Sequence, residues 1–418
     1  MAGEFLKRHG FDLDAELSKI QFGGGNSTPK DATTAFSKDD GAAPEPRSHL
    51  ASVHTITGAK LPRKPLLWNI HIADGKIASV EPHQFNGPIL AHKQGVLEAN
   101  GRLIAPSLCH AHIHLDKCFL LQDTKFSDLE IIEGDFQEAM TLTTKAKRRF
   151  ERGDLMRRGR QLITESIQAG VTAMRAFVEV DRDVMLKCLD AGLALKKEFA
   201  ERCEIQICAF AQLPLFSGED GGDMVRKLMK EAATRDGVDV LGSTPYVEQD
   251  PIKEKINVRW MCTIALRFKK HLDLHLDYHL DTNKEPLIWS VLDIIKTRNW
   301  PKQGKTITMG HCTRLTQFKA NDWQRLKEDI GELPVSFVGL PTSDMFMMRS
   351  ERGVRGTLHV PDLIRKHDLV AAIAINNVGN AFTPHGNCDP LMVASLGVGL
   401  YSAGTKSDAD LLFVCIQA

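Results

Sequence analysis

The feature that most constrains the fold is a repeated alternation of short apolar runs with longer stretches of helical periodicity. Several runs are rich in β-branched residues, and helical patterns such as 182–202, 222–235 and 287–298 separate them. Parallel neighbours in a sheet need a crossover connection, so this alternation predicts a parallel sheet. Eight such units match a (β/α)8 TIM-type barrel, the α/β fold class that we expect. The predicted strands are 102–109, 173–180, 204–211, 239–247, 272–278, 306–312, 334–341 and 369–376.

A smaller β-domain is expected before the barrel. Residues 69–80 alternate around Asp74-Gly75, and Asn100-Gly101 marks a second turn, which are strong hairpin signals. Residues 23–47 are rich in Gly, Ser, Thr and Pro and lack periodicity. A helical insertion is expected over 126–168, the longest gap between predicted strands. The predicted parts are a disordered or loosely ordered N-terminal segment (1–49), small β-domain strands (50–101) and the barrel (102–418).

Polar side chains stand where several of the apolar runs end. They are His112 and His114 after the first run, Gln212 at the end of the third, His275 in the fifth, His311 in the sixth and Asn376 at the end of the eighth. Active sites of such barrels lie at the C-terminal ends of the strands. We therefore expect these side chains to converge on one mouth of the barrel.

The pair His112-Ile113-His114 favours a metal site. Alternation along a strand end puts both imidazoles on one side of the chain, close enough to chelate one ion. Two hydrogen-bonded polar residues at a strand terminus are the structural alternative. No lysine lies in or directly after the fourth apolar run, so a carboxylated-lysine bridge between two metals is not expected. We therefore expect a single divalent ion, Zn²⁺ or Fe²⁺, in the site.

The run 271–281 supplies the third predicted ligand. Its histidines at spacing four could share a helix face, as in zincins, but every second residue is polar and the residues between them are apolar. A strand puts the apolar residues on one face, so a strand is favoured. His275 is then the predicted ligand, with Asp277 on the same face as a candidate catalytic group. His271 and His279 are not expected to bind the metal directly, and they should lie behind the ligands or on the surface.

Composition excludes several function classes. Lys plus Arg and Asp plus Glu both number 53, so the formal net charge is zero and no nucleic-acid partner is expected. No apolar run approaches 18 residues, and the N-terminus lacks a signal-peptide core, so no membrane partner is expected. The nine cysteines lack any CxxC pair, which is typical of reduced thiols in a cytoplasmic protein. A small-molecule substrate is the expected partner.

The polar segments together resemble a known family. Residues 104–117, Ile-Ala-Pro-Ser-Leu-Cys-His-Ala-His-Ile-His-Leu-Asp-Lys, look like the first-strand signature of cytosine-deaminase-like enzymes of the amidohydrolase superfamily. The similarity continues, in consistent order, through 171–180, 207–212, 273–277, 310–313 and 376–382. The resemblance implies a mononuclear zinc or iron(II) site that activates water to displace nitrogen from a ring or amidine carbon. The implied activity is deamination, or hydrolysis of an amide or a ring C–N bond.

The resemblance also implies roles for individual residues. His112, His114 and His275 match metal ligands, Gln212 matches a substrate-binding glutamine, and His311 matches a histidine that assists the attack. Asn380, in the motif that closes the eighth strand, is a second candidate for substrate binding. Lys117 either reaches the site or pairs with a nearby acid, and the sequence leaves both readings open.

Two departures from the family pattern concern proton transfer. Tyr278 stands where the deaminases have a proton-shuttling glutamate, and Asn376 stands where they have an aspartate that is both ligand and base. An amide oxygen can coordinate a metal but cannot act as a base, and an unperturbed phenol, with a pKa near 10, is a donor at neutral pH. Asp277, Asp281 or His311 could serve as the base instead.

Three functions therefore stay open. The leading hypothesis is a metal-dependent hydrolase in which Tyr278 donates a proton or a hydrogen bond. The alternative is a catalytically degenerate barrel that binds a small molecule or a partner, and the third is a metal-assisted reaction that needs no strong base.

The family's chains return to complete the small domain, whereas this sequence ends soon after the eighth helix. An incomplete β-sandwich with an open edge is expected, and pairing of that edge leaves a homo-oligomer open.

Overall fold

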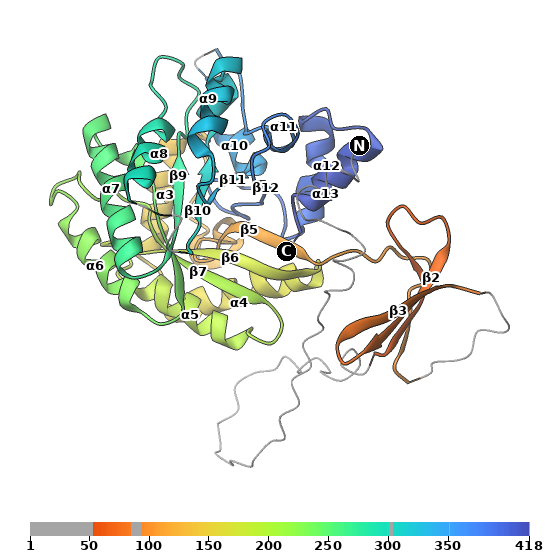
Figure 1. The fold of residues 1–418 in the computed structure, drawn as a ribbon. Helices are drawn as coiled ribbons and strands as arrows, with labels where there is room; N and C mark the ends of the chain where they lie inside the picture. Colours follow the sequence, from red (N-terminus) through yellow and green to blue (C-terminus); the bar gives the residue numbers. More distant parts are fainter. Residues whose placement is uncertain (1–52, 85–93, 299, 301–303, 351, 418) are drawn as a thin grey trace, which may run out of the picture. The chain divides into compact units, whose positions relative to one another are not determined.

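The computed structural model describes residues 53–84, 94–298, 300, 304–350 and 352–417. The chain divides into two compact units, with the boundary between Pro106 and Ser107. The first unit contains a four-stranded sheet and the second an eight-stranded sheet (Figure 1). The segment predicted to be loosely ordered, 1–49, lies outside the described residues.

The small sheet has the strand order β3-β2-β1-β4. Its strands are β1 (Thr55–Lys60), β2 (Leu67–Ala73), β3 (Lys76–Pro82) and β4 (Val96–Glu98). The predicted hairpin joins β2 to β3, with Asp74 at φ 51° and Gly75 at φ 70°, the left-handed pair that a tight two-residue turn requires. Ile56, Ala59 and Ile70 are buried on this sheet. The described residues of this unit form this one sheet, without the second layer of a sandwich.

The large sheet confirms the predicted (β/α)8 architecture. Its neighbouring strands follow the order of the sequence, and every pair is parallel. The strands are β5 (Leu108–His114), β6 (Val171–Glu179), β7 (Glu204–Ala211), β8 (Val238–Ser243), β9 (His271–Leu276), β10 (Ile307–His311), β11 (Val335–Gly339) and β12 (Ala371–Ile373).

The first barrel strand was placed too early by the sequence pattern. The apolar run at 102–109 led to that prediction, but Leu103 pairs with Lys60 and Ile104 packs on the core of the small sheet. Strand β5 begins at Leu108 and runs through the histidines, so His112 and His114 lie in the strand rather than after it. An apolar run can thus belong to a neighbouring unit.

The barrel closes between its first strand and the residues that follow its last strand. Ile113 forms a parallel bridge with Asn376, the N–H of His114 donates to the Asn376 carbonyl (2.8 Å), and the N–H of Asn376 donates to the His112 carbonyl (3.1 Å). At the opposite end of these strands, the N–H of Cys109 donates to the carbonyl of Ile416 (2.8 Å). The final described residues therefore pair with β5 of the barrel.

Helices surround the barrel strands, as Figure 1 shows. Between consecutive strands lie α4 (Arg152–Gln168), α5 (Lys187–Glu198), α6 (Asp223–Thr234), α7 (Pro251–Arg267), α8 (Ile288–Thr297), α9 (Ala320–Ile330), α10 (Pro341–Met347) and α11 (Val360–Arg365). Helices α12 (Pro390–Leu400) and α13 (Lys406–Val414) follow β12, and the predicted insertion contains α3 (Phe136–Lys147) before α4. The three helical patterns named from the sequence correspond to α5, α6 and α8. No helix among the described residues is long and apolar enough to cross a membrane.

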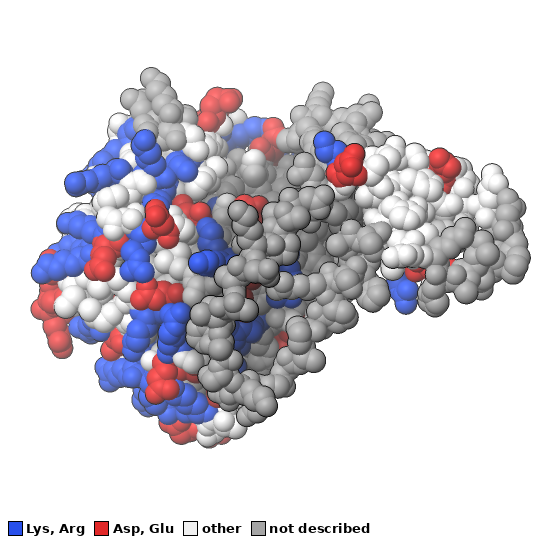
Figure 2. Space-filling view, turned by 90° about the horizontal axis from the view of Figure 1, so that it is seen from below, with Lys and Arg blue, Asp and Glu red and all other residues white. Residues whose placement is uncertain are grey.

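The visible surface carries no large area of one charge. On the face shown in Figure 2, Lys and Arg side chains intermingle with Asp and Glu over the described residues. This distribution accords with the zero formal net charge of the chain. All nine cysteines are free thiols, and eight of them are buried.

The interior of the barrel below its mouth is filled by aromatic and small side chains. Phe177, Cys208, Phe210 and Val240 form one buried cluster. Gly242 on β8 leaves the room that this cluster needs, because a Cβ there would lie 2.9 Å from Cys208 Sγ and 2.9 Å from Phe210 Cδ2. The barrel is thus closely packed beneath the site.

Gly242→Ala is expected to lower the free energy of unfolding of the barrel by about 1–3 kcal/mol, since the added methyl group must displace a packed neighbour. Gly153→Ala is the matched control, because Gly153 is exposed on α4 and a Cβ there would meet nothing within 4 Å. That control should leave stability unchanged or raise it by up to about 1 kcal/mol. Denaturant unfolding followed by circular dichroism measures both, and equal midpoints for the two variants would contradict the close packing.

Candidate functional site

A β-bulge aims the histidine pair of β5 into the barrel. Against β6, the register of β5 shifts between His110 and Ile113, so one extra residue is accommodated there. His110 consequently points outward, where its Nε2 lies 3.0 Å from Ser166 Oγ on α4. Beyond the bulge, His112 points inward and its ring stacks on Phe177 at a centroid distance of 3.9 Å.

Three histidines meet at the C-terminal end of the barrel. The ring nitrogens that His112, His114 and His275 can offer to a metal lie within 4.8 Å of one another, and all three side chains are buried. Four of their ring nitrogens have no hydrogen-bond partner among the described residues: His112 Nδ1 and Nε2, His114 Nδ1 and His275 Nε2. Buried polar atoms are rarely left unpaired, so these nitrogens are available to bind a metal ion.

The electrostatics of this cluster suit metal binding. Burial lowers the pKa of His112, His114 and His275 well below the ordinary value, and the neighbouring histidines lower it further. Neutral imidazole is the form that ligates a metal. The residues present therefore fit a divalent cation. Histidine nitrogens suit zinc and iron alike, so they do not select one metal.

Asn376 adds an oxygen to the same cluster. Its backbone pairs with β5 where the barrel closes, and its side chain lines the same cavity as His114 and His275. Its Nδ2 donates to Ser343 Oγ (2.8 Å), while its Oδ1 is buried without a partner among the described residues. The amide oxygen thus has no competing partner among the described residues.

His311 is held by an aspartate that the sequence analysis did not identify. The Nδ1 of His311 lies 2.7 Å from Asp344 Oδ1 on α10, and Thr357 Oγ1 donates to the other carboxylate oxygen (2.7 Å). Burial raises the pKa of Asp344, and its hydrogen bonds with His311 and Thr357 oppose that rise. With a hydrogen on Nδ1, the Nε2 of His311 is free to accept a proton at the cavity.

Tyr278 is placed as a hydrogen-bond donor. Its ring lies over that of His311, with a centroid distance of 3.9 Å, and it lines the cavity. Burial raises the pKa of Tyr278 well above its usual value, and the charge of Asp344 adds to this rise. The phenol therefore stays protonated at neutral pH and cannot replace a carboxylate base.

Lys117 both reaches the cavity and pairs with an acid, so the two readings of the sequence hold together. Its Nζ donates to Glu179 Oε1 (2.8 Å) and lies 3.4 Å from Gln212 Oε1, and both Lys117 and Gln212 line the cavity. Glu179 also binds the Nζ of Lys147 at 2.6 Å. A buried cation and an amide thus stand side by side on one wall.

Asp277, a predicted site residue, does not face the cavity. The carboxylate of Asp277 accepts the N–H groups of Leu287 (2.7 Å) and Ile288 (3.0 Å), so it caps the start of α8 and does not line the cavity. Strand alternation placed Asp277 beside His275, but its backbone turns to φ 48° at the strand end and redirects the side chain. Asp281, the other aspartate considered as a base, is exposed.

Asn380 is used by the loop that carries it. Its Oδ1 accepts from the N–H groups of Phe382 (3.0 Å) and Thr383 (3.1 Å), and its Nδ2 donates to the carbonyl of Lys117 (3.1 Å). Its side chain is fully buried and does not line the cavity. Asn380 therefore fixes its own loop and does not face the cavity.

Aromatic side chains cover the histidines. Phe136 of the insertion lies near Tyr246, Tyr278 and Phe382, with ring centroids 6.1, 6.1 and 5.9 Å away. The cavity beneath is small, with a volume of about 20 Å³. The sequence analysis identified Tyr278 but missed Phe136, Tyr246, Phe382 and Asp344. Asp344 could have been found by the strand-end rule already used, since it closely follows the apolar run of the seventh strand.

No family model matches the chain. In sequence, it is 22% identical over 363 residues to the N-isopropylammelide isopropyl amidohydrolase of Pseudomonas sp. (strain ADP), covering 87% of this chain and 84% of that protein. This similarity runs along most of both chains.

Solved structures share the fold. A 5-methylcytosine deaminase from Klebsiella pneumoniae liganded with 5-fluorocytosine superposes with a TM-score of 0.74 at 23% identity, covering 87% of this chain and 84% of that chain. The N-isopropylammelide isopropylaminohydrolase of Burkholderia multivorans superposes with a TM-score of 0.65 at 23% identity, with the same coverage. The chain is thus similar in sequence to an amidohydrolase and shares the fold of a deaminase and an aminohydrolase.

Proposed function

We propose that this protein is a metal-dependent hydrolase that cleaves a C–N bond of a small, nitrogen-containing molecule. The observation that carries the proposal is the convergence of three buried histidines, with unpartnered ring nitrogens, beside a His311–Asp344 pair. The relatives described above are named for the hydrolysis of N-isopropylammelide and the deamination of 5-methylcytosine, both nitrogen heterocycles. A heterocycle that carries an amino or alkylamino group is accordingly the proposed substrate class. The nine free thiols support work in the reducing cytoplasm.

His112, His114, His275 and the Asn376 amide oxygen would hold one divalent ion, Zn²⁺ or Fe²⁺. Such an ion supplies Lewis acidity, which makes water a competent nucleophile at neutral pH. Phe177 and Phe210 lie against the histidine rings, at centroid distances of 3.9 Å from His112 and 4.3 Å from His275. This packing would keep the ligand atoms oriented.

His311 is the proposed general base. Of the groups on the cavity wall, Tyr278 stays protonated, the amide of Asn376 cannot accept a proton, and Lys117 is engaged with Glu179. Asp344 would hold the Nδ1–H of His311, so that Nε2 takes a proton from the attacking water and passes it to the leaving nitrogen. The His311–Asp344 pair would thereby perform the proton transfers that the family assigns to carboxylates.

The rest of the wall would bind and orient the substrate. The Lys117 ammonium, the Gln212 amide and the Tyr278 hydroxyl are among the polar groups that could bind a heterocycle with ring nitrogens and an oxo group. Phe136 and Phe382 would cover its faces and exclude water.

The second candidate function is a barrel that binds a small molecule without turning it over, because Tyr278 and Asn376 replace the usual carboxylates. The double variant Tyr278→Glu/Asn376→Asp separates the two functions. If it deaminates cytosine-class substrates while the natural protein hydrolyses no heterocyclic amine, the binding function is favoured. Turnover by the natural protein excludes it.

Purified without chelators, the protein is expected to contain about one zinc or iron ion per chain, because the cluster offers a single set of ligands. Elemental mass spectrometry should find this metal lost in His112→Ala/His114→Ala and retained in the control His279→Ala, since His279 lies outside the cluster. A natural protein that stays empty after reconstitution with both metals would contradict the proposed site.

His311→Asn and Asp344→Asn should each lower kcat by roughly 100- to 10,000-fold, because either change disables the proton-transferring pair. The assay is release of ammonia or alkylamine from aminopyrimidines and aminotriazines, with product analysis in ¹⁸O-labelled water. Asp281→Asn is the matched control and should leave kcat within about twofold, because Asp281 is exposed and its carboxylate accepts the Asn283 N–H, as an amide could. Product without solvent oxygen would rule out hydrolysis.

A further inference from the structure

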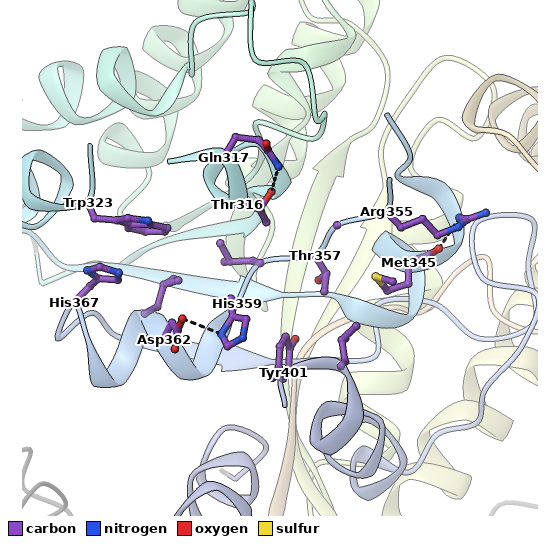
Figure 3. A pocket seen from close by; sticks show the side chains of 14 residues that line it. Thr316, Gln317, Trp323, Met345, Arg355, Thr357, His359, Asp362, His367 and Tyr401 are labelled. Carbon is purple, nitrogen blue, oxygen red and sulfur yellow. Dashed lines mark hydrogen bonds and ion pairs between the residues drawn. The ribbon is translucent and has the colours of Figure 1, made fainter. Parts of the chain in front are cut away.

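The barrel cavity, as it stands, is too small for the substrate class proposed above. Its volume of about 20 Å³ gives room for roughly one water molecule, which is far less than a heterocycle needs. A larger hollow of about 400 Å³, shown in Figure 3, is not part of the same space, because none of its lining residues lines the barrel cavity. A heterocycle can therefore enter only if part of the cavity wall moves.

The segment that carries Phe136 is held to the barrel by apolar contacts. This segment, residues 131–140, is termed the lid, and it includes the first turn of α3. Its apolar side chains pack against a cluster on the cavity rim that contains Tyr278, Met347, Ala381 and Phe382. Among the described residues, no hydrogen bond or ion pair links the lid to any part of the chain outside α3. Apolar contacts are non-directional, so the lid can leave the rim without breaking a specific bond.

The lid is tied together from within. The carboxylate of Glu138 accepts the N–H groups of Ile132 (2.7 Å), Glu133 (3.0 Å) and Gly134 (2.7 Å). Asp135, the N-cap of α3, accepts the N–H of Glu138 (2.7 Å). These bonds lie inside the lid and are not broken when it leaves the rim, so the lid can move as one piece.

The other end of α3 is anchored by buried charge. The Nζ of Lys147 lies 2.6 Å from Glu179 Oε2 and 2.5 Å from Asp181 Oδ2, and the Lys147 side chain is only 3% exposed. Breaking a buried ion pair leaves unpaired charges out of water, which is costly. Helix α3 is thus fixed at its C-terminal end and releasable at its N-terminal end.

The rest of the wall is tied to the barrel. The histidines of the cavity lie in strands β5, β9 and β10. The N–H of Phe382 donates to Asn380 Oδ1 (3.0 Å). On the rim that the lid packs against, Arg355 donates to the carbonyls of Met345 (2.6 Å) and Phe346 (2.7 Å), the first of which Figure 3 shows. The lid is therefore the part of the wall that can open at least cost.

We propose that the lid opens to admit the substrate and closes over it, and that Phe136 sets the size of substrate that the closed site accepts. Phe136 is the lid residue that lines the cavity. Its ring centroid lies 6.1 Å from those of Tyr246 and Tyr278 and 5.9 Å from that of Phe382. It is thus the lid side chain that meets a bound ring or its substituent. The size limit rests on the proposed function, whereas the lid itself can be tested without turnover.

Thiol labelling tests the lid without a substrate. Ala139 on the lid and Ala146 at the anchored end belong to the same helix and are 1% and 0% exposed. Iodoacetamide should alkylate the new thiol of Ala139→Cys at least about tenfold faster than that of Ala146→Cys, because the lid opens without unfolding of the barrel. Peptide mass spectrometry distinguishes each new thiol from the nine natural ones. Equal labelling rates would overturn the lid.

Hydrogen exchange of the natural chain gives the same comparison without a substitution. The amides of residues 139–142 in α3 should exchange at least about tenfold faster than those of 144–147, which lie at the anchored end. Uniform protection along the helix would contradict the lid.

The part played by Phe136 has its own variant. Phe136→Ala, introduced into the Ala139→Cys chain, should speed alkylation at least about threefold, since the lid loses its aromatic contacts with the rim. Gln137→Ala is the matched control, because Gln137 is exposed on the same turn, and it should leave the rate within about twofold. Equal rates in the two chains would overturn the role of Phe136.

Turnover tests the size limit. With N-alkylated aminotriazines, Phe136→Ala should raise the ratio of kcat/KM for an N-butyl over an N-methyl substrate at least about tenfold, whereas Gln137→Ala should leave it unchanged. The same ratio in both variants would overturn the size limit. Fast labelling of Ala139→Cys in a protein that hydrolyses no heterocyclic amine would support the lid and contradict the proposed function.

Discussion

The backbone pairing that closes the barrel is the interaction on which the site depends. The hydrogen bonds between Asn376 and the residues of β5 join the first strand to the chain after the last one. A barrel closed in this way has no free sheet edge at this seam, and the same bonds bring Asn376 beside His112 and His114. Closure of the barrel and the approach of Asn376 to the histidine pair of β5 therefore rest on the same two hydrogen bonds.

Left-handed backbone at the strand ends decides which side chains face the cavity. Asp277, His311 and Asn376 have φ values of 48°, 66° and 70°, and each stands at or just beyond the C-terminal end of its strand. Such conformations cost on the order of 1 kcal/mol or more for residues other than glycine, and they persist only where the surrounding structure enforces them. They break strand alternation at this edge, so Asp277 turns to α8 while His311 turns to Asp344.

Buried charge surrounds the cavity in compensated pairs. Lys117 and Lys147 share Glu179, and Lys147 also binds Asp181 at 2.5 Å. Taking these charges out of water is costly, and their mutual attraction and hydrogen bonds offset that cost only while every partner is present. The network thus holds the Lys117 ammonium at one wall of the cavity. On the other wall, Asp344 holds His311 and in turn accepts a hydrogen bond from Thr357.

The sequence by itself determined the strand count, the parallel barrel, and the convergence of His112, His114 and His275, because apolar periodicity and strand-end position are local properties of the chain. It placed the first strand too early, since an apolar run does not reveal which unit buries it. Only the tertiary structure decided that Asp277 caps a helix, that Asn380 fixes a loop, and that Asp344 holds His311. Those roles depend on which groups meet across the packed barrel, often from residues far apart in the chain.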